Sequence, residues 1–187
     1  MKNNPLTLLF HCLFICLLIA FSNIAFADFE KVKTKTFSGE KFLFPQDIKG
    51  TPLSLLFLAM SSDRDNGQLQ QKQLIEWHTV LEERNILNQN INSYHFPVMK
   101  NPPFFVKGII RNAMAEVYEG TTALDQAGVL YVKNLAKFAN QAGLTLDEKP
   151  TLVLLNDQGK ILGEIKGSVS EDTIQQLTVL ITLSKDE

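Results

Sequence analysis

The run of residues 53–60 constrains the fold of this chain more than any other stretch. It is almost continuously apolar, it ends abruptly at the polar residues Ser61, Ser62, Asp63 and Arg64, and a long helical pattern follows. A short apolar run that is bounded by turn residues and followed by a helix is typical of a strand buried on both faces of a sheet. The chain is therefore predicted to be an α/β protein organised around this strand.

The N-terminus differs in kind from the rest of the chain. Lys2 precedes an apolar run over residues 6–21, and the small residues Ala25 and Ala27 come just after it. This pattern predicts a secretory signal over residues 1–27, cleaved before Asp28. The alternative is an uncleaved membrane anchor, although the run is short for the roughly 20 residues of a bilayer span. We expect an exported protein, most simply a periplasmic one, whose domain spans residues 28–187.

Both cysteines, Cys12 and Cys16, lie inside the N-terminal apolar run, so residues 28–187 contain none. Thioredoxin-type and peroxidase catalysis require a thiolate. We therefore expect neither thiol-disulfide oxidoreductase nor peroxidase activity. The 187 residues are 45% hydrophobic with a formal charge of −2, which suits one compact domain and gives no indication of nucleic-acid binding.

The patterns after residue 63 predict alternating helices and strands. In the first helix Trp77 has helical spacing with Leu74 and Leu81, which predicts that it belongs to the core. The later elements are a strand over residues 91–99, a helix over 104–118, a short strand over 129–132, a helix over 135–142, a hairpin over 149–167 and a last helix that begins near residue 170.

This order, with Pro150 and Thr151 just before the hairpin, resembles the thioredoxin-like superfamily. The resemblance implies a three-layer α/β sandwich with a mixed sheet, a C-terminal β-hairpin and helix, and a helical insertion in the middle. It also implies that Pro150 follows a cis peptide bond and faces residues 61–64. The alternative is that Pro150 and Thr151 are simply a common way to begin a strand.

A second, narrower resemblance covers residues 96–99, the proline break after them and residues 104–114. These segments are similar to bacterial relatives of the mitochondrial ATP synthase assembly factor family, which are themselves thioredoxin-like. The resemblance implies a chaperone-like role in the assembly of membrane complexes.

The polar residues offer little sign of catalysis. Ser61 and Ser62 would need a neighbouring base to act as nucleophiles, and Asp63 is equally explained as a helix N-cap. His78 lies beside the apolar face of its helix and is expected to be a buried histidine satisfied by a neighbour. No histidine or cysteine pattern has metal-ligand spacing. We assign no catalytic residue, no metal and no cofactor.

Two functions remain open. The first is a non-catalytic module that holds an extended protein or peptide client in a cleft, with backbone groups beside the proline pairing with it. The second is an enzyme that uses unrecognised chemistry at Asp63, Arg64 or His78. We favour the first, and its cleft residues would be Ser61, Ser62, Asp63, Arg64, Pro150 and Thr151.

The helix over residues 104–118 has more apolar surface than one docked face requires. We expect it to pack on the core. Phe104, at the start of the helix, is the residue that this packing needs least. The alternative is that Phe104 and Phe105 form an exposed patch, beside the cations Lys107 and Arg111, that contacts a membrane surface or a membrane-embedded client.

Overall fold

The computed structural model describes residues 28–48, 52–88 and 90–184. The predicted signal over residues 1–27 lies outside the described residues. No helix in the described ranges has both the length and the apolar character needed to cross a membrane.

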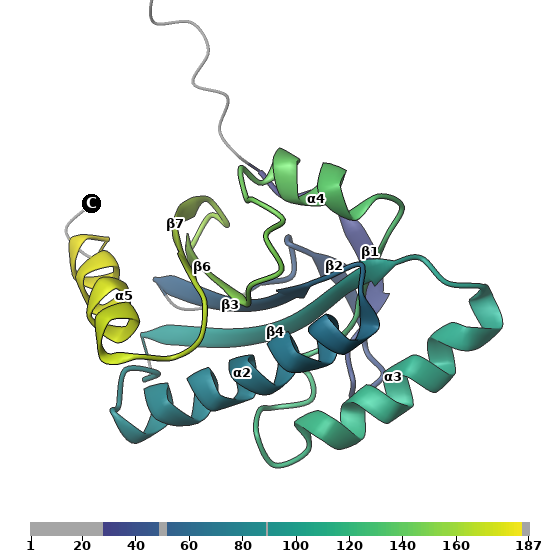
Figure 1. Ribbon diagram of the computed structural model, residues 1–187, viewed down its shortest axis with the longest axis horizontal. Coiled ribbons are helices and arrows are strands. Elements are labelled where there is room, and N and C mark those ends of the chain that lie inside the picture. The colour runs from purple at the N-terminus through teal and green to yellow at the C-terminus, as the bar shows by residue number, and fades with distance from the viewer. Residues whose placement is uncertain (1–27, 49–51, 89, 185–187) are drawn as a thin grey trace, which may run out of the picture.

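A five-stranded mixed sheet forms the centre of the domain (Figure 1). Its order is β5-β4-β3-β6-β7, with β4 parallel to β3 and β6 antiparallel to it, and a separate hairpin joins β1 to β2. The strands are β1 (Val32–Lys35), β2 (Lys41–Phe44), β3 (Leu53–Met60), β4 (Ile91–Lys100), β5 (Leu130–Val132), β6 (Thr151–Asn156) and β7 (Ile161–Lys166). The helices are α2 (Arg64–Glu83), α3 (Phe104–Tyr118), α4 (Leu135–Gln141) and α5 (Glu171–Leu183).

Strand β3 is the buried central strand that the sequence predicts, because all eight of its residues are buried. Successive side chains of a strand point to opposite faces of the sheet. Leu55 and Phe57 accordingly pack in the core layer under α2 and α5, whereas Leu56 and Leu58 pack in the layer under α4 and the β1–β2 hairpin. One strand thus joins both halves of the core.

Helix α2 covers the first of these faces and carries Trp77. The indole is fully buried, which confirms the predicted core position. Its Nε1 donates a hydrogen bond of 2.9 Å to the backbone oxygen of Gly167, just after β7. Trp77 therefore connects α2 to the C-terminal hairpin as well as filling the core.

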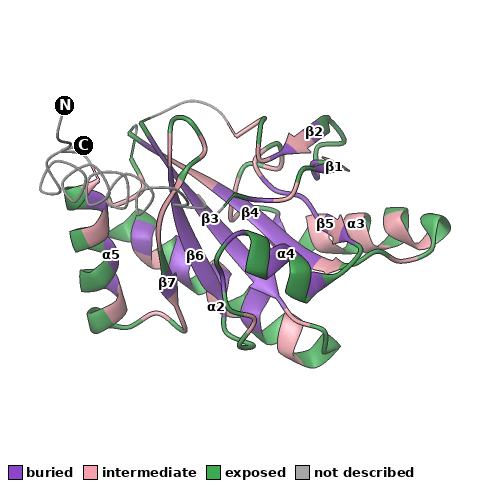
Figure 2. Ribbon diagram, turned by 90° about the horizontal axis from the view of Figure 1, so that it is seen from above, coloured by how far each residue is buried: buried purple, intermediate pink, exposed green. Residues whose placement is uncertain are grey.

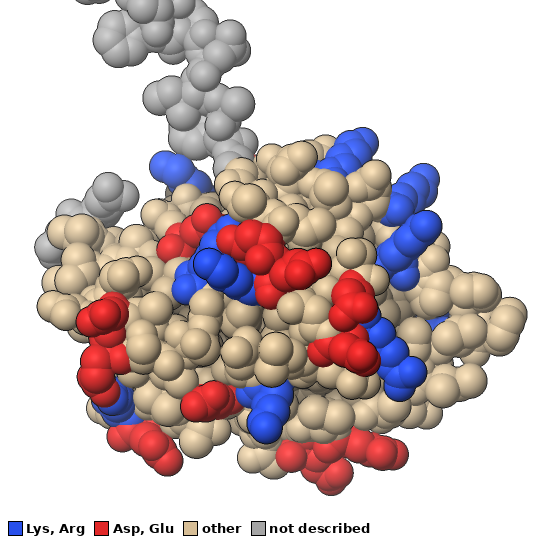
Figure 3. Space-filling model, viewed as in Figure 1, with Lys and Arg blue, Asp and Glu red and all other residues tan. Residues whose placement is uncertain are grey.

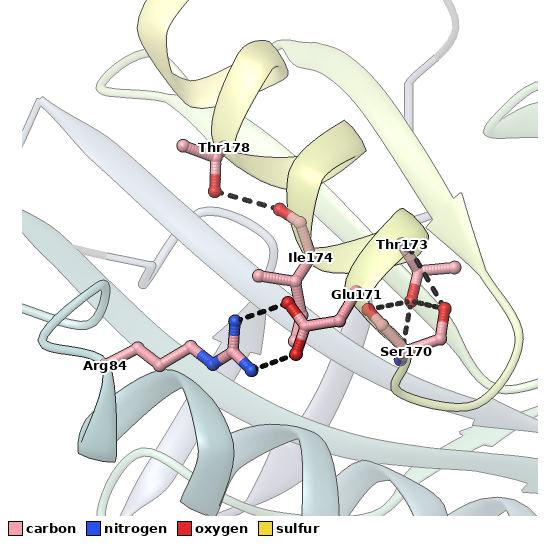
Figure 4. A network of polar contacts seen from close by, with 6 residues as sticks. All are labelled: Arg84, Ser170, Glu171, Thr173, Ile174 and Thr178. Carbon is pink, nitrogen blue, oxygen red and sulfur yellow. Dashed lines mark hydrogen bonds and ion pairs between the residues drawn. The ribbon is translucent and has the colours of Figure 1, made fainter.

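Helix α5 begins at a capping box. Ser170 accepts a hydrogen bond from the Thr173 amide, and the Thr173 hydroxyl accepts one from the Ser170 amide, so two otherwise unpaired donors are satisfied (Figure 4). The carboxylate of the neighbouring Glu171 accepts hydrogen bonds from both terminal guanidinium nitrogens of Arg84, at the end of α2. The pair is solvent-exposed and joins the ends of two helices that share one face of the sheet.

Helix α3 departs from the expected core packing. Only Tyr118, at its end, is buried, and its beginning projects from the body of the domain (Figure 2). Ile110 and Met114 pack partly against the buried cluster of Phe37, Tyr118, Ala127 and Val129. One narrow stripe suffices to dock the helix, so most of its apolar surface stays outside the core.

Pro150 also departs from expectation. The one cis peptide bond in the described ranges joins Phe44 to Pro45, and Pro150 follows a trans bond. The chain turns into β6 at Glu148, which has a left-handed backbone with φ of +60°. The implied cis geometry at Pro150 is therefore wrong for this chain.

Candidate functional site

The loop after β3 is held by the first turn of α2. Asp63 is the N-cap of the helix and its Oδ1 accepts a hydrogen bond of 2.8 Å from the Asn66 amide, as the capping interpretation predicts. The Ser61 hydroxyl in turn accepts a 3.0 Å hydrogen bond from the Asp63 amide. These contacts fix the loop in one conformation with its side chains at the surface.

Gln70 anchors the same loop from within the helix. It is fully buried, its Oε1 accepts a 2.8 Å hydrogen bond from the Met60 amide, and its Nε2 donates to the Met60 carbonyl at 3.1 Å. A third contact joins Gln70 Nε2 to Asn66 Oδ1 at 2.6 Å, and Asn66 donates to the Glu148 carbonyl at 3.1 Å. Sequence reasoning missed this clamp, although a glutamine on the strand-facing side of an amphipathic helix was a visible signal.

A cleft of about 880 Å³ opens beside this loop. Its walls are the loop, the start of α2, the end of β4, one side of α3 and the start of α4. Its lining residues are Ala59, Ser61, Ser62, Asp63, Arg64, Gly67, Gln68, Gln71, Pro97, Val98, Met99, Lys100, Ile110, Ala113, Met114, Val117, Lys133, Asn134, Leu135, Ala136 and Leu146.

The cleft combines an apolar lining with a basic rim. Aliphatic and methionine side chains from β4 and α3 form much of its wall. Its charged lining residues are three cations, Arg64, Lys100 and Lys133, and one carboxylate, that of Asp63. Such a surface suits a ligand that has an apolar segment and an acidic group. It contains no thiol and no histidine.

Four of the six predicted cleft residues, Ser61, Ser62, Asp63 and Arg64, line this cleft, and Pro150 and Thr151 do not. Thr151 is fully buried between Leu58 of β3 and Lys166 of β7. The Pro150 carbonyl accepts a hydrogen bond of 2.9 Å from the Gly167 amide. The Pro150 carbonyl and the backbone of Thr151 are thus already used within the sheet.

A pair of histidines lies deep in the domain. His78 Nδ1 on α2 lies 2.9 Å from His95 Nε2 on β4, and the two side chains are 3% and 0% exposed. This confirms that His78 is a buried histidine satisfied by a neighbour. The partner was not predicted, although His95 falls on the same side of its strand as Ile91, and that side faces α2.

The contacts of the pair indicate where its protons lie. His78 Nε2 is 3.3 Å from Glu82 Oε1, which favours a proton on that nitrogen and leaves Nδ1 to accept from His95 Nε2. Burial lowers the pKa of both imidazoles, and for His95 the neighbouring His78 lowers the pKa further. For His78 the carboxylate of Glu82 opposes the effect of burial. The pair is therefore neutral in the folded protein at neutral pH.

Solved structures of other proteins share this architecture at low identity. The chain is 11% identical to BsSco, a member of the Sco family of cytochrome c oxidase assembly proteins, with a TM-score of 0.55 over 86% of this chain and 95% of that one. It is 12% identical to yeast Sco1 with copper bound, with a TM-score of 0.56 over 83% and 93% of the two chains. The chain has a thioredoxin-like fold. No protein-family model matches the sequence, and no curated protein matches it significantly.

A third similar structure is a SCO1/SenC family lipoprotein from Bacillus anthracis, 11% identical, with a TM-score of 0.53 over 85% of this chain and 96% of that one. The comparisons support the predicted three-layer α/β sandwich with its mixed sheet. At these identities they establish the fold alone. The narrower resemblance to ATP synthase assembly factors stays a prediction.

The copper in the yeast protein raises the question of whether this chain could hold a similar ion. Soft thiolate ligands favour copper, and residues 28–187 contain no cysteine. Among the described residues, no three side chains of the His, Cys, Asp and Glu types come together as a metal site. His78 and His95 are already bonded to each other. The described chain therefore offers a copper ion neither a thiolate nor a cluster of these four residue types.

Proposed function

We propose that this chain is an exported, non-redox thioredoxin-like protein that binds a protein or peptide client and acts in a chaperone-like way. The observation that carries the proposal is the cleft of about 880 Å³ beside residues 61–64, in a domain that has no cysteine from Asp28 onward. The position after β3 supplies binding groups where a redox protein of this fold would need a thiolate.

The lining of the cleft supports a client rather than a small polar metabolite. Apolar side chains of β4 and α3 favour an apolar client segment, and the three cations at the rim favour an acidic residue beside it. We further propose that the clients belong to membrane complexes. The role named for BsSco, a cytochrome c oxidase assembly protein, supports this suggestion by likeness of fold.

Photo-cross-linking in intact cells tests the cleft directly. A benzophenone amino acid at Gln68, which is exposed and lines the cleft, should form adducts with client proteins. The matched control is the same group at Gln176, an exposed glutamine on α5 outside the cleft. We expect adducts at position 68 in at least severalfold excess over position 176, measured by immunoblot and mass spectrometry.

A second variant separates binding from folding. Ala113 is an exposed residue of α3 that lines the cleft, so Ala113→Glu should place an acid in the apolar wall without disturbing the core. The adducts at position 68 should then fall several-fold while the thermal midpoint stays unchanged. Equal adducts at positions 68 and 176, or adducts that persist in Ala113→Glu, would show that clients do not use the cleft.

We also predict that the protein lacks thiol chemistry. The form that spans residues 28–187 should show no turnover above buffer in insulin-reduction and peroxide-consumption assays, because it has no thiol. Ser61→Cys alone should remain inactive in insulin reduction, since exchange also needs a resolving thiol. Turnover by the unaltered form would refute the non-redox assignment.

A further inference from the structure

The beginning of α3 carries apolar side chains that the domain does not cover. Phe104, Phe105 and Ile109 are 90%, 77% and 69% exposed. Single exposed apolar residues are ordinary, but large ones gathered within two helical turns mark an interaction surface. We call these residues and two neighbouring cations the α3-tip surface, which comprises Lys100, Phe104, Phe105, Ile109 and Arg111.

Packing within the domain does not require these aromatic side chains. Ile110, Met114 and Tyr118 are four residues apart, lie on one face of α3 and make its contacts with the core. Phe105 and Ile109 are also four residues apart and lie on a different face. The Tyr131 hydroxyl donates a 3.1 Å hydrogen bond to the Lys107 carbonyl and adds to the docking on the inner side. The outer apolar face therefore serves something other than the fold.

The charge around the tip has one sign. Residues 85–115 contain no Asp or Glu, and their charged residues are Lys100, Lys107 and Arg111. Lys107 Nζ lies 5.0 Å from the centre of the Tyr131 ring, and within the described chain no carboxylate forms an ion pair with any of the three cations. Lys107 therefore lies against Tyr131 on the docked side of α3, whereas Lys100 and Arg111 remain available to an anionic partner.

The shape of the tip favours a membrane over a protein partner. It projects from the domain (Figure 2), and the space-filling view shows mainly uncharged residues at its end (Figure 3). An aromatic side chain buries about 150–250 Å², whereas a standard protein interface takes about 800 Å² from each partner. Three apolar side chains on a convex tip fall short of such an interface but are sufficient to enter a bilayer boundary.

We propose that the α3-tip surface docks on an anionic lipid bilayer. Phe104, Phe105 and Ile109 enter the headgroup boundary, and Lys100 and Arg111 meet lipid phosphates. The inference goes beyond client binding, but the two sites adjoin, because Ala113 and Val117 of α3 line the cleft and Lys100 belongs to both sites. Docking would keep the mouth of the cleft close to the membrane surface.

Depth-dependent quenching by brominated lipid tests the proposal in the full chain. Phe105→Trp places a reporter in the tip, and Val179→Trp places one at a half-exposed site on α5. Trp77 contributes the same buried background to both. With vesicles that contain phosphatidylglycerol, Phe105→Trp should be quenched and blue-shifted and Val179→Trp should not. The readout is specific to position, so membrane binding by another segment does not imitate it.

The charge requirement has its own control. Quenching of Phe105→Trp should be much weaker with phosphatidylcholine alone, and adding K100Q and R111Q should weaken partitioning into anionic vesicles roughly tenfold to thirtyfold. Equal quenching at positions 105 and 179, or equal partitioning into both vesicle types, would overturn the proposal. A concentration-dependent dimer that is lost in the F104S/F105S variant would also overturn it, because the occupant would then be a second copy. Cross-linking at Gln68 tests the cleft separately from all of these outcomes.

Discussion

Replacing Trp77 with alanine should lower the free energy of unfolding by about 3–5 kcal/mol, the typical cost of removing a large aromatic side chain from a core. The indole is fully buried among residues that include Leu74 and Leu81 of its own helix, and removing a large side chain from a close-packed core leaves a cavity. The substitution also leaves the Gly167 carbonyl without the indole N–H that it accepts at 2.9 Å. Chemical denaturation followed by circular dichroism measures the loss.

Two controls make the result specific. Trp77→Phe keeps an apolar ring and should cost clearly less than Trp77→Ala. Leu69→Ala changes a half-exposed residue of the same helix and should stay within about 0.5 kcal/mol of the unaltered protein. If Trp77→Ala cost no more than Leu69→Ala, the indole would not be a core residue and the packing of α2 on the sheet would need revision.

The periodic parts of the fold could be predicted from the sequence because each carries a local signal. The apolar run of β3 predicts a buried strand, and the tight turn before Gly159 predicts the hairpin of β6 and β7. Asp63 and Ser170 predict helix starts, and both are N-caps. In these elements the hydrogen-bonding partners are close in sequence, so spacing alone indicates the structure.

The site was harder to predict because its contacts join residues that are distant in sequence. The pairing of His78 with His95 depends on α2 crossing β4, and the Gln70 clamp depends on the exact rotation of the helix. The superfamily resemblance implies a cis peptide bond before Pro150, and that bond is trans in this chain. Of the predicted cleft residues, those that line the cleft are residues 61–64, which directly follow β3 in the sequence.

Helix α3 shows a different limit. Its sequence predicts a helix correctly, yet the amount of apolar surface does not say how much of it is docked. The inner stripe of Ile110, Met114 and Tyr118 satisfies the packing, and Phe104 and Phe105 remain outside. Excess apolar surface beyond one docked face is therefore a better sign of interaction than total hydrophobicity.

Acidification below neutral pH should destabilise the protein through its histidine pair. Burial lowers the pKa of His78 and His95, so below about pH 6.5 the unfolded chain binds protons that the folded chain does not. The stability that the neutral pair contributes is fully present above that pH and is lost as the pH falls below it. A histidine that stays neutral in the folded protein lowers the free energy of unfolding at pH 5.5 by about 1.4 kcal/mol relative to its value at high pH. His95 should approach this value, and His78 should lose less because Glu82 stabilises its charged form.

Replacing both histidines removes every imidazole from the domain, because residues 28–187 contain no histidine other than these two. The other ionisable groups near the pair are Glu82 and Tyr118, and burial raises the pKa of Tyr118, which keeps the phenol neutral throughout this range. Denaturation curves at pH 7.5 and 5.5 should therefore differ for the unaltered domain and nearly coincide for the H78Q/H95Q variant, whatever its absolute stability. An equal loss of stability in both proteins would assign the acid sensitivity to carboxylates and would mean that the histidines are already charged, or free to become charged, within the fold.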